Sequence, residues 1–203
     1  MGLMLSQSLL NIRRVGVFLL ACALFWFLPA AHAGWLLSGS LPPSTAEPLG
    51  AETEPPPAYY DFCMEHLDIC DNEDRQPASI ELTPKNIAKI QKLNLEINTA
   101  INQVSDMMHY KTAEKWSIPI DGAGDCEDIS ILKRLRLIKM GFPIPSLLLT
   151  LVHAPQEGNH IVLTVKTNQG DYVLDNLTDD ILPWSATPYK FIKRQSDYQQ
   201  NVW

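Results

Sequence analysis

Two stretches of the chain repeat apolar side chains every three or four residues, which is the spacing of an amphipathic helix. The first begins after Thr83, a residue type that caps helices, with Pro84 at the first helical position. Its apolar positions are Ile87, Ile90, Leu93, Ile97, Ile101, Val104 and Met108. We therefore predict one long helix from Pro84 to about Met108. Asn, Gln and Lys occupy its other face, which indicates a scaffold role.

The second stretch follows Asp125, a residue suited to cap a helix that runs from Cys126 to about Met140. Gly141, just beyond this helix, and Pro143 give the expected stop signal. The apolar stripe consists of Ile129, Leu132, Leu135 and Ile138. Basic side chains gather toward the end of the helix, where they complement its dipole. They are Lys133, Arg134, Arg136 and Lys139.

Beyond the second helix the pattern changes to short apolar runs that are typical of strands. We predict strands over 146–153, 160–166 and 171–177, and a weaker strand over 189–194. Helices come first and strands follow, so the order predicts an α+β fold with an antiparallel sheet. The sequence contains no internal repeat.

The first 33 residues have the features of a secretory signal peptide, which predicts export to the periplasm. Arg13 and Arg14 form a basic start, residues 15–29 are mainly apolar, and Ala31-His32-Ala33 has the form of a cleavage site. An uncleaved membrane anchor is the alternative, although the apolar run is shorter than the roughly 20 residues that span a bilayer.

Composition separates an arm from a folded domain in the rest of the chain. Residues 34–58 are rich in Pro and lack apolar periodicity, so we expect a flexible arm before a single domain over 59–203. The 203 residues include 23 acidic and 16 basic side chains, a net charge of -7. Because no basic run occurs, a protein that binds nucleic acid is excluded.

Export gives the cysteines a particular meaning, because disulfides form in an oxidising compartment. Cys63 and Cys70 are close enough in sequence to close a short loop, and Cys126 is then left over. A cysteine without a partner in an exported protein indicates intermolecular pairing or a reactive thiol.

The surroundings of Cys126 favour the reactive thiol. At the first turn of a helix, free N–H groups and the positive end of the dipole lower the pKa of a thiol. The glycine-rich residues 122–125 leave room for a substrate carbonyl, and the Cys126 N–H can then stabilise an oxyanion. We predict that Cys126 is a nucleophile.

A thiol nucleophile needs a base, and the base needs an acceptor that orients it. If Lys166 pairs with Asp171, the antiparallel register makes His160 and Asp175 diagonal neighbours on one sheet face. Their Cβ atoms then lie within about 7 to 8 Å, close enough for a hydrogen bond between imidazole and carboxylate. His153 is the competing base, but no carboxylate falls in register with it.

Several motifs occur together in residues 59–203. They are Cys63, Cys70, Trp116, Gly124-Asp125-Cys126-Glu127-Asp128, Gly158-Asn159-His160, Tyr172-Val173-Leu174-Asp175-Asn176, Arg194-Gln195-Ser196 and Trp203. This combination resembles the bacterial transglutaminase-like cysteine peptidases, in particular their periplasmic LapG-type branch. Gly-Asp-Cys alone would be a weak signal, because several peptidase and transglutaminase families share it.

The resemblance implies a papain-like, transglutaminase-like core in which the nucleophile helix packs on an antiparallel sheet. It implies that Cys126, His160 and Asp175 form a catalytic triad. It also implies that Trp116 lines the oxyanion side of the site or the substrate groove.

The resemblance further implies dependence on Ca²⁺, with Asp125 and Glu127 as ligands and Asp128 as a third. Three carboxylates within one helical turn suit the preference of Ca²⁺ for hard oxygen ligands. The alternative is that these acids only complement the helix dipole.

By resemblance, the substrate is the N-terminal region of a large cell-surface adhesin, whose release promotes biofilm dispersal. The implied partner is a LapD-type inner-membrane receptor for cyclic-di-GMP. Two alternatives remain: a transglutaminase-type acyl transferase that uses the same acyl-enzyme, and a non-catalytic adaptor of the receptor. The intact Cys, His and Asp set argues against the adaptor.

Overall fold

The computed structural model describes residues 39–70 and 75–203. In chain order the elements are α2 (Pro57–Glu65), α3 (Pro84–Ala100), β1 (Asn102–Gln103), α4 (Asp106–His109), β2 (Ala123–Gly124), α5 (Cys126–Lys139), η1 (Ile144–Ser146), β3 (Leu147–Ala154), β4 (Gly158–Thr167), β5 (Gly170–Leu174), β6 (Leu182–Pro183), η2 (Trp184–Ala186) and β7 (Lys190–Arg194). The signal peptide predicted at 1–33 lies outside the described residues. None of the helices in the described part could cross a membrane.

The main sheet has five antiparallel strands in the order β6-β5-β4-β3-β7. All four predicted strands are present, and the α+β class is confirmed. Lys166 pairs with Asp171 and Leu163 with Leu174, which is the predicted register between β4 and β5. The short strand β6 escaped prediction because two residues carry no periodicity.

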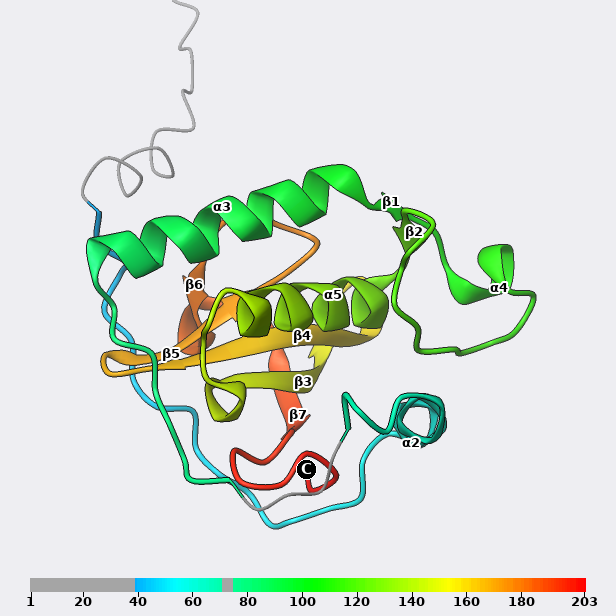
Figure 1. The fold of residues 1–203 in the computed structure, drawn as a ribbon, viewed down its shortest axis with the longest axis horizontal. Coiled ribbons are helices and arrows are strands. Elements are labelled where there is room, and N and C mark those ends of the chain that lie inside the picture. The colour runs from blue at the N-terminus through cyan, green and yellow to red at the C-terminus, as the bar shows by residue number, and fades with distance from the viewer. Residues whose placement is uncertain (1–38, 71–74) are drawn as a thin grey trace, which may run out of the picture. The chain divides into compact units, whose positions relative to one another are not determined.

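Two helices form layers on one side of the sheet. In Figure 1, α5 lies along β3 and β4, and α3 lies on the far side of α5. Ile129 and Leu137 of α5 and Leu149 and Leu163 of the sheet are fully or almost fully buried in the core between them. The short strand β2 leads directly into α5, so this packing fixes the position of the helix start and of Cys126.

The long helix predicted to end near Met108 is wrong in its second half. Thr83 caps α3 as expected, through its side chain and the Asn86 N–H, but the helix ends at Ala100. Residues 101–104 leave the helix because they pair with the segment before Cys126. The Asn102 N–H donates to the Gly122 carbonyl at 2.9 Å, and the Val104 N–H donates to Gly124 at 3.1 Å.

The helix α5 matches its prediction within one residue at its end, and Gly141 follows with a positive φ of 90°. Asp125 occupies the N-cap position, but its side chain makes no capping hydrogen bond. Its carboxylate instead accepts the Asp106 N–H from α4 at 3.1 Å. The Asp125 side chain therefore connects the start of α5 to α4 instead of capping its own helix.

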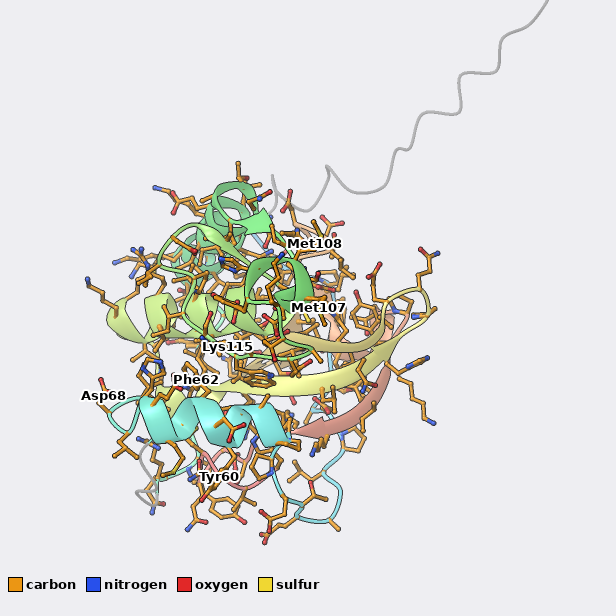
Figure 2. The ribbon with its side chains drawn as sticks, turned by 90° about the vertical axis from the view of Figure 1, so that its right-hand side faces the viewer. Tyr60, Phe62, Asp68, Met107, Met108 and Lys115 are labelled. Carbon is orange, nitrogen blue, oxygen red and sulfur yellow. A yellow bond between two sulfur atoms is a disulfide. The ribbon has the colours of Figure 1, made fainter. Side chains whose placement is uncertain are left out.

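The helix α2 packs through one face onto the domain. Figure 2 shows Phe62 on the inner side of α2 and Tyr60 on the opposite side, in agreement with their burial. A disulfide between Cys63 and Cys70 holds the turn after this helix. Cys126 is the free cysteine of the described residues.

Residues 39–56, which we call the N-terminal strap, are the described part of the arm expected over 34–58, whose first residues, 34–38, lie outside the described residues. The strap residues form no helix or strand, as expected, yet hydrogen bonds fasten them along the domain. The Glu47 N–H donates to the Asp171 carboxylate at 2.9 Å, and the Arg194 guanidinium binds both of these acids. Thr53 and Trp203 exchange main-chain hydrogen bonds. The sequence pattern missed the strap because these bonds use its backbone rather than an apolar periodicity.

The strap crosses the turn between β4 and β5 at Gly170. This residue has a φ of 106°, and a Cβ there would lie 2.5 Å from the Ser44 carbonyl carbon and 2.6 Å from the Thr45 nitrogen. Only glycine allows the two backbones to approach so closely.

Replacing Gly170 tests whether the strap is part of the fold. Gly141→Ala, also at positive φ but without a neighbour within 4 Å, should cost only the backbone strain, about 1 to 2 kcal/mol. Gly170→Ala should cost about 3 kcal/mol or more, because the strap must also move. Thermal unfolding and limited proteolysis within 39–56 measure the difference. Equal losses in the two variants, with the strap still protected, would contradict this account.

Candidate active site

Cys126 is the first residue of α5 and faces β4. Its half-buried thiol lies 3.4 Å from the Ile161 main-chain nitrogen, which donates to Sγ. One turn further along the helix, the Ser130 hydroxyl donates to the Ile161 carbonyl at 3.1 Å. Two contacts to one strand residue therefore fix the helix start beside His160, the neighbour of Ile161.

The turn before Cys126 requires a glycine. A Cβ on Gly124 would lie 2.7 Å from the Asp128 carboxylate oxygen and 2.8 Å from its Cβ. Asp128 fills the space beside Gly124 that a side chain would need, so this glycine makes room for Asp128, and the predicted room for a substrate carbonyl stays a prediction.

His160 and Asp175 form the predicted contact. His160 Nε2 and Asp175 Oδ1 are 2.8 Å apart, and the side chains are only 3% and 2% exposed. This arrangement leaves Nδ1 as the ring nitrogen that can exchange a proton with a thiol. His153, the competing base, is exposed and pairs with Asn159 across β3 and β4.

The Asp175 carboxylate is held ionised. Burial opposes its charge, but hydrogen bonds and charge from His160, together with the Tyr189 hydroxyl, outweigh burial and lower the pKa of Asp175. The Leu177 N–H also donates to Oδ1 at 3.1 Å. A stable carboxylate in this position orients the imidazole and can stabilise its cation.

The Cys126 thiol differs from our prediction. Burial, followed by the charge of Glu127, raises its pKa well above the ordinary value. The thiol donates to Glu127 Oε2 at 3.1 Å. The predicted lowering by the helix N-terminus is wrong for this structure, because burial of the thiol, with the acids beside it, outweighs the partial charge of a helix end.

Three acids meet at the start of α5, of which Asp106 and Asp128 are buried and Asp125 is half-buried. Asp106, Asp125 and Asp128 each offer a carboxylate oxygen, and these oxygens all lie within 4.8 Å of one another. One oxygen of each acid accepts a main-chain N–H, from Lys115, Asp106 and Ser117 respectively. Figure 2 shows Lys115 near α4, with Met107 and Met108 of that helix labelled above it.

The second oxygen of each of these three acids is buried without a hydrogen-bond partner. Burial raises the pKa of Asp106, and it raises the pKa of Asp128 to about 7. Backbone donors thus hold one oxygen of each carboxylate and leave the other oxygen without a protein partner. This donor set fits a hard divalent cation, which prefers carboxylate oxygens.

The predicted metal ligands are only partly brought together. Asp125 and Asp128 belong to the group described above, whereas Glu127 lies in a second group with Asp106 and Glu114. Burial and the charge of Asp125 raise the pKa of Glu127 to about 9. Asp106 belongs to both groups and was missed, because it lies 19 residues before Asp125 inside a stretch that reads as helix.

The role expected of Trp116 is corrected by its position. Its ring is 3% exposed and packs edge-on against Tyr59 at 5.4 Å between centroids, and near Trp203 at 6.2 Å. Its indole N–H donates to Glu114 at 2.9 Å. Trp116 therefore packs in an aromatic core with Tyr59 and Trp203, and its buried ring is not placed to contact a substrate.

The loop after β5 is held from behind by two helices. Asn98 of α3 donates to the carbonyls of Asp175 and Thr178, at 2.9 and 3.1 Å. Lys133 of α5 donates to the same Asp175 carbonyl at 2.8 Å. The polar face predicted to be a scaffold thus positions the acid that binds His160.

We expected Lys133 to complement the helix dipole, but its side chain is 1% exposed and donates to the Asp175 carbonyl. Burial lowers its pKa from 10.5 to about 7. The unfolded chain therefore binds more protons than the folded chain between these values, so this amine makes stability rise with pH there.

Lys133→Met removes that dependence. The gain of the variant over the wild type in unfolding free energy should be largest at pH 6 and should fall above pH 7, by on the order of 1 kcal/mol per pH unit. Urea unfolding at pH 6, 7.5 and 9 measures it. Lys139→Met, at an exposed lysine of the same helix, is the control and should show no such trend. A gain for Lys133→Met that does not vary with pH would refute the buried charge.

A helix that begins at a cysteine and packs on an antiparallel sheet, with an imidazole on β4 and a carboxylate just after β5, is the arrangement expected of a cysteine peptidase of the transglutaminase-like kind. The chain belongs to the bacterial transglutaminase-like cysteine proteinase (BTLCP) family, whose sequence pattern matches residues 49–203. The match begins within the strap, ten residues before the domain boundary that we expected.

Solved structures of LapG from Legionella pneumophila are similar to this chain. The calcium-bound form is 29% identical, with a TM-score of 0.49, over 56% of this chain and 66% of that one. A second LapG structure is 28% identical, with a TM-score of 0.49, over 57% and 67%. An EGTA-treated form is 30% identical, with a TM-score of 0.47, over 55% and 63%. The chain thus spans about two thirds of the length of these structures. No curated protein matches it.

Proposed function

We propose that this chain is a periplasmic, calcium-dependent cysteine endopeptidase in which Cys126, His160 and Asp175 form the catalytic triad. The observation that carries the proposal is the buried hydrogen bond between His160 and Asp175, next to the residue whose N–H binds the Cys126 thiol. Membership of the family supports the reaction class.

In the proposed reaction, His160 accepts the proton of the Cys126 thiol, and Sγ attacks the carbonyl carbon of the scissile peptide bond. The Cys126 N–H, at the free end of α5, stabilises the oxyanion. His160 then gives its proton to the leaving amine, and an acyl-enzyme remains. A water molecule, deprotonated by His160, attacks the acyl carbon and releases Sγ. While Sγ donates to Glu127 the thiol keeps its proton, so this hydrogen bond must break before Sγ can attack.

We assign the calcium site to Asp106, Asp125 and Asp128, with Glu127 close by. The three unpartnered, buried oxygens support this assignment. When bound, Ca²⁺ would supply the positive charge that these acids lack and would offset their effect on the thiol. The assignment keeps two of the ligands expected from the sequence and adds Asp106.

The substrate and partner rest on resemblance. We propose that the enzyme cuts the N-terminal region of a large surface adhesin in the periplasm, and that a LapD-type receptor for cyclic-di-GMP controls it. The outward side chains of Met107 and Met108, 56% and 71% exposed, lie beside the proposed calcium site and would be accessible to a protein partner.

The triad is tested with residues 34–203 and an N-terminal fragment of the candidate adhesin. Cys126→Ala and His160→Ala should abolish cleavage while the thermal unfolding curve is retained. Asp175→Asn should leave about 10⁻⁴ of the activity, because the base is misoriented but present. His153→Ala, at an exposed strand histidine, is the matched control and should retain full activity.

Normal turnover by His160→Ala would show that the base is a different residue. Incorporation of an added amine in place of hydrolysis would favour the transglutaminase reaction. A wild-type chain that binds the receptor but cuts nothing would favour the adaptor.

The calcium site is tested by unfolding as well as by cleavage. Calcium should raise the melting temperature of the wild type, since a ligand stabilises the state that binds it, and a chelator should stop cleavage. Asp106→Asn should lose most of both responses, because affinity depends on the number of charged ligands. Glu96→Gln, at an exposed acid of α3, is the control.

Magnesium should replace calcium poorly, since it requires octahedral geometry. A wild type indifferent to chelator would show that the acids serve a structural purpose only.

A further inference from the structure

Tyr189 contacts both the proposed base and the acid that orients it. Its hydroxyl donates to Asp175 Oδ2, the carboxylate oxygen that His160 does not use. Its ring meets the His160 imidazole in an edge-on arrangement, with centroids 5.7 Å apart and planes at 67°. Tyr189 is the residue just before β7, far from both partners in sequence.

The position of Tyr189 is fixed by packing on the outer face of the sheet. Together with Trp184 and Phe191 it covers an apolar cluster of Val152, Val162 and Val173, one residue from each of the strands β3, β4 and β5. Phe191, two residues later, pairs with Val152 in the ladder between β7 and β3. The start of β7 and the apolar cluster therefore fix the position of the Tyr189 ring near His160.

We propose that Tyr189 is a positioning residue, which holds the Asp175 carboxylate and the His160 ring in the orientation that the reaction needs. The inference rests on the proposed function, in which His160 is the base. A carboxylate with a donor on each oxygen cannot rotate away from Nε2, and an aromatic edge against the imidazole limits its swing. The hydroxyl thus acts on His160 through Asp175, whereas the ring acts on His160 directly.

The charged and titratable groups around Asp175 come from several elements. His160 lies on β4, Tyr189 precedes β7, and Lys133 of α5 binds the main-chain carbonyl, with Asp179 of the following loop also close to Lys133. Tyr189 is the neutral donor among those that reach the carboxylate through a side chain. Its removal changes the surroundings of Asp175 without adding or removing a charge.

Tyr189→Phe removes the hydroxyl alone and is compared with Tyr172→Phe. Tyr172 lies on β5 and is 1% exposed, and its hydroxyl donates to the Pro42 carbonyl of the strap at 2.7 Å, away from the triad. In adhesin cleavage, Tyr189→Phe should lower kcat by about tenfold with KM unchanged, the effect of losing one hydrogen bond to a charged group. Tyr172→Phe should keep the wild-type kcat, even if its melting temperature falls.

A second measurement does not depend on peptidase activity. The carboxyl carbon of Asp175, assigned by NMR through Asp175→Asn, should titrate at higher pH in Tyr189→Phe than in the wild type, because the lost donor favoured the ionised form. Tyr172→Phe should titrate like the wild type. An unchanged Asp175 titration in Tyr189→Phe, or equal losses of kcat in both tyrosine variants, would overturn the inference. A shifted titration in a chain that cleaves nothing would support the contact while refuting the proposed function.

Discussion

Several carboxylates lie close together at the start of α5, where little of their surface is exposed to solvent. The contacts that hold these carboxylates shape much of the structure around them. Asp106, Asp125 and Asp128 each have one oxygen fixed by a main-chain N–H and one oxygen buried without a partner. Like charges at this distance must be offset by protons or by a cation. Burial, and after it the charge of the neighbouring acids, raises the pKa of Asp106, of Glu127 and of Asp128.

The backbone between α3 and α5 is shaped to hold these acids. The main chain at 102–104 pairs with 122–124, and this parallel pairing brings Asp106 next to the helix that follows β2. The intervening loop supplies the N–H groups of Lys115 and Ser117, while the Trp116 ring between them anchors the loop in the core. A helix continuing to Met108 would have made this arrangement impossible.

The reactivity of Cys126 therefore depends on the charge balance around it rather than on the helix dipole alone. A helix end contributes only about half an elementary positive charge to stabilise a thiolate. Against it, the hydrogen bond from Sγ to Glu127 stabilises the protonated thiol. In contrast, the proposed base and its orienting acid are already in place, because His160 and Asp175 are buried and hydrogen-bonded to each other, with further contacts from Lys133 and Tyr189. Of the proposed triad, Cys126 is therefore the member whose reactivity depends on the charges around it.

The sequence was sufficient where periodicity or register decides the structure. Strand order along the chain, the cap at Thr83 and the pairing of Lys166 with Asp171 were all predictable, and the last of these placed His160 beside Asp175. Asp106, Tyr189 and the strap could not be found in this way, because tertiary contacts between distant segments decide their positions. The role expected of Trp116 was wrong because it came from a motif, and a motif residue can serve packing: the ring packs against Tyr59.

The central claim is that cation binding and nucleophile reactivity are coupled at the start of α5. The most direct test is the rate at which iodoacetamide alkylates Cys126 at neutral pH, with calcium and with a chelator, located by mass spectrometry. Because the thiolate is the reactive form, we predict alkylation about tenfold faster or more with calcium, while Cys63 and Cys70 stay joined and unlabelled. Equal rates in the two conditions, or a Cys126 that does not react at all, would contradict the account.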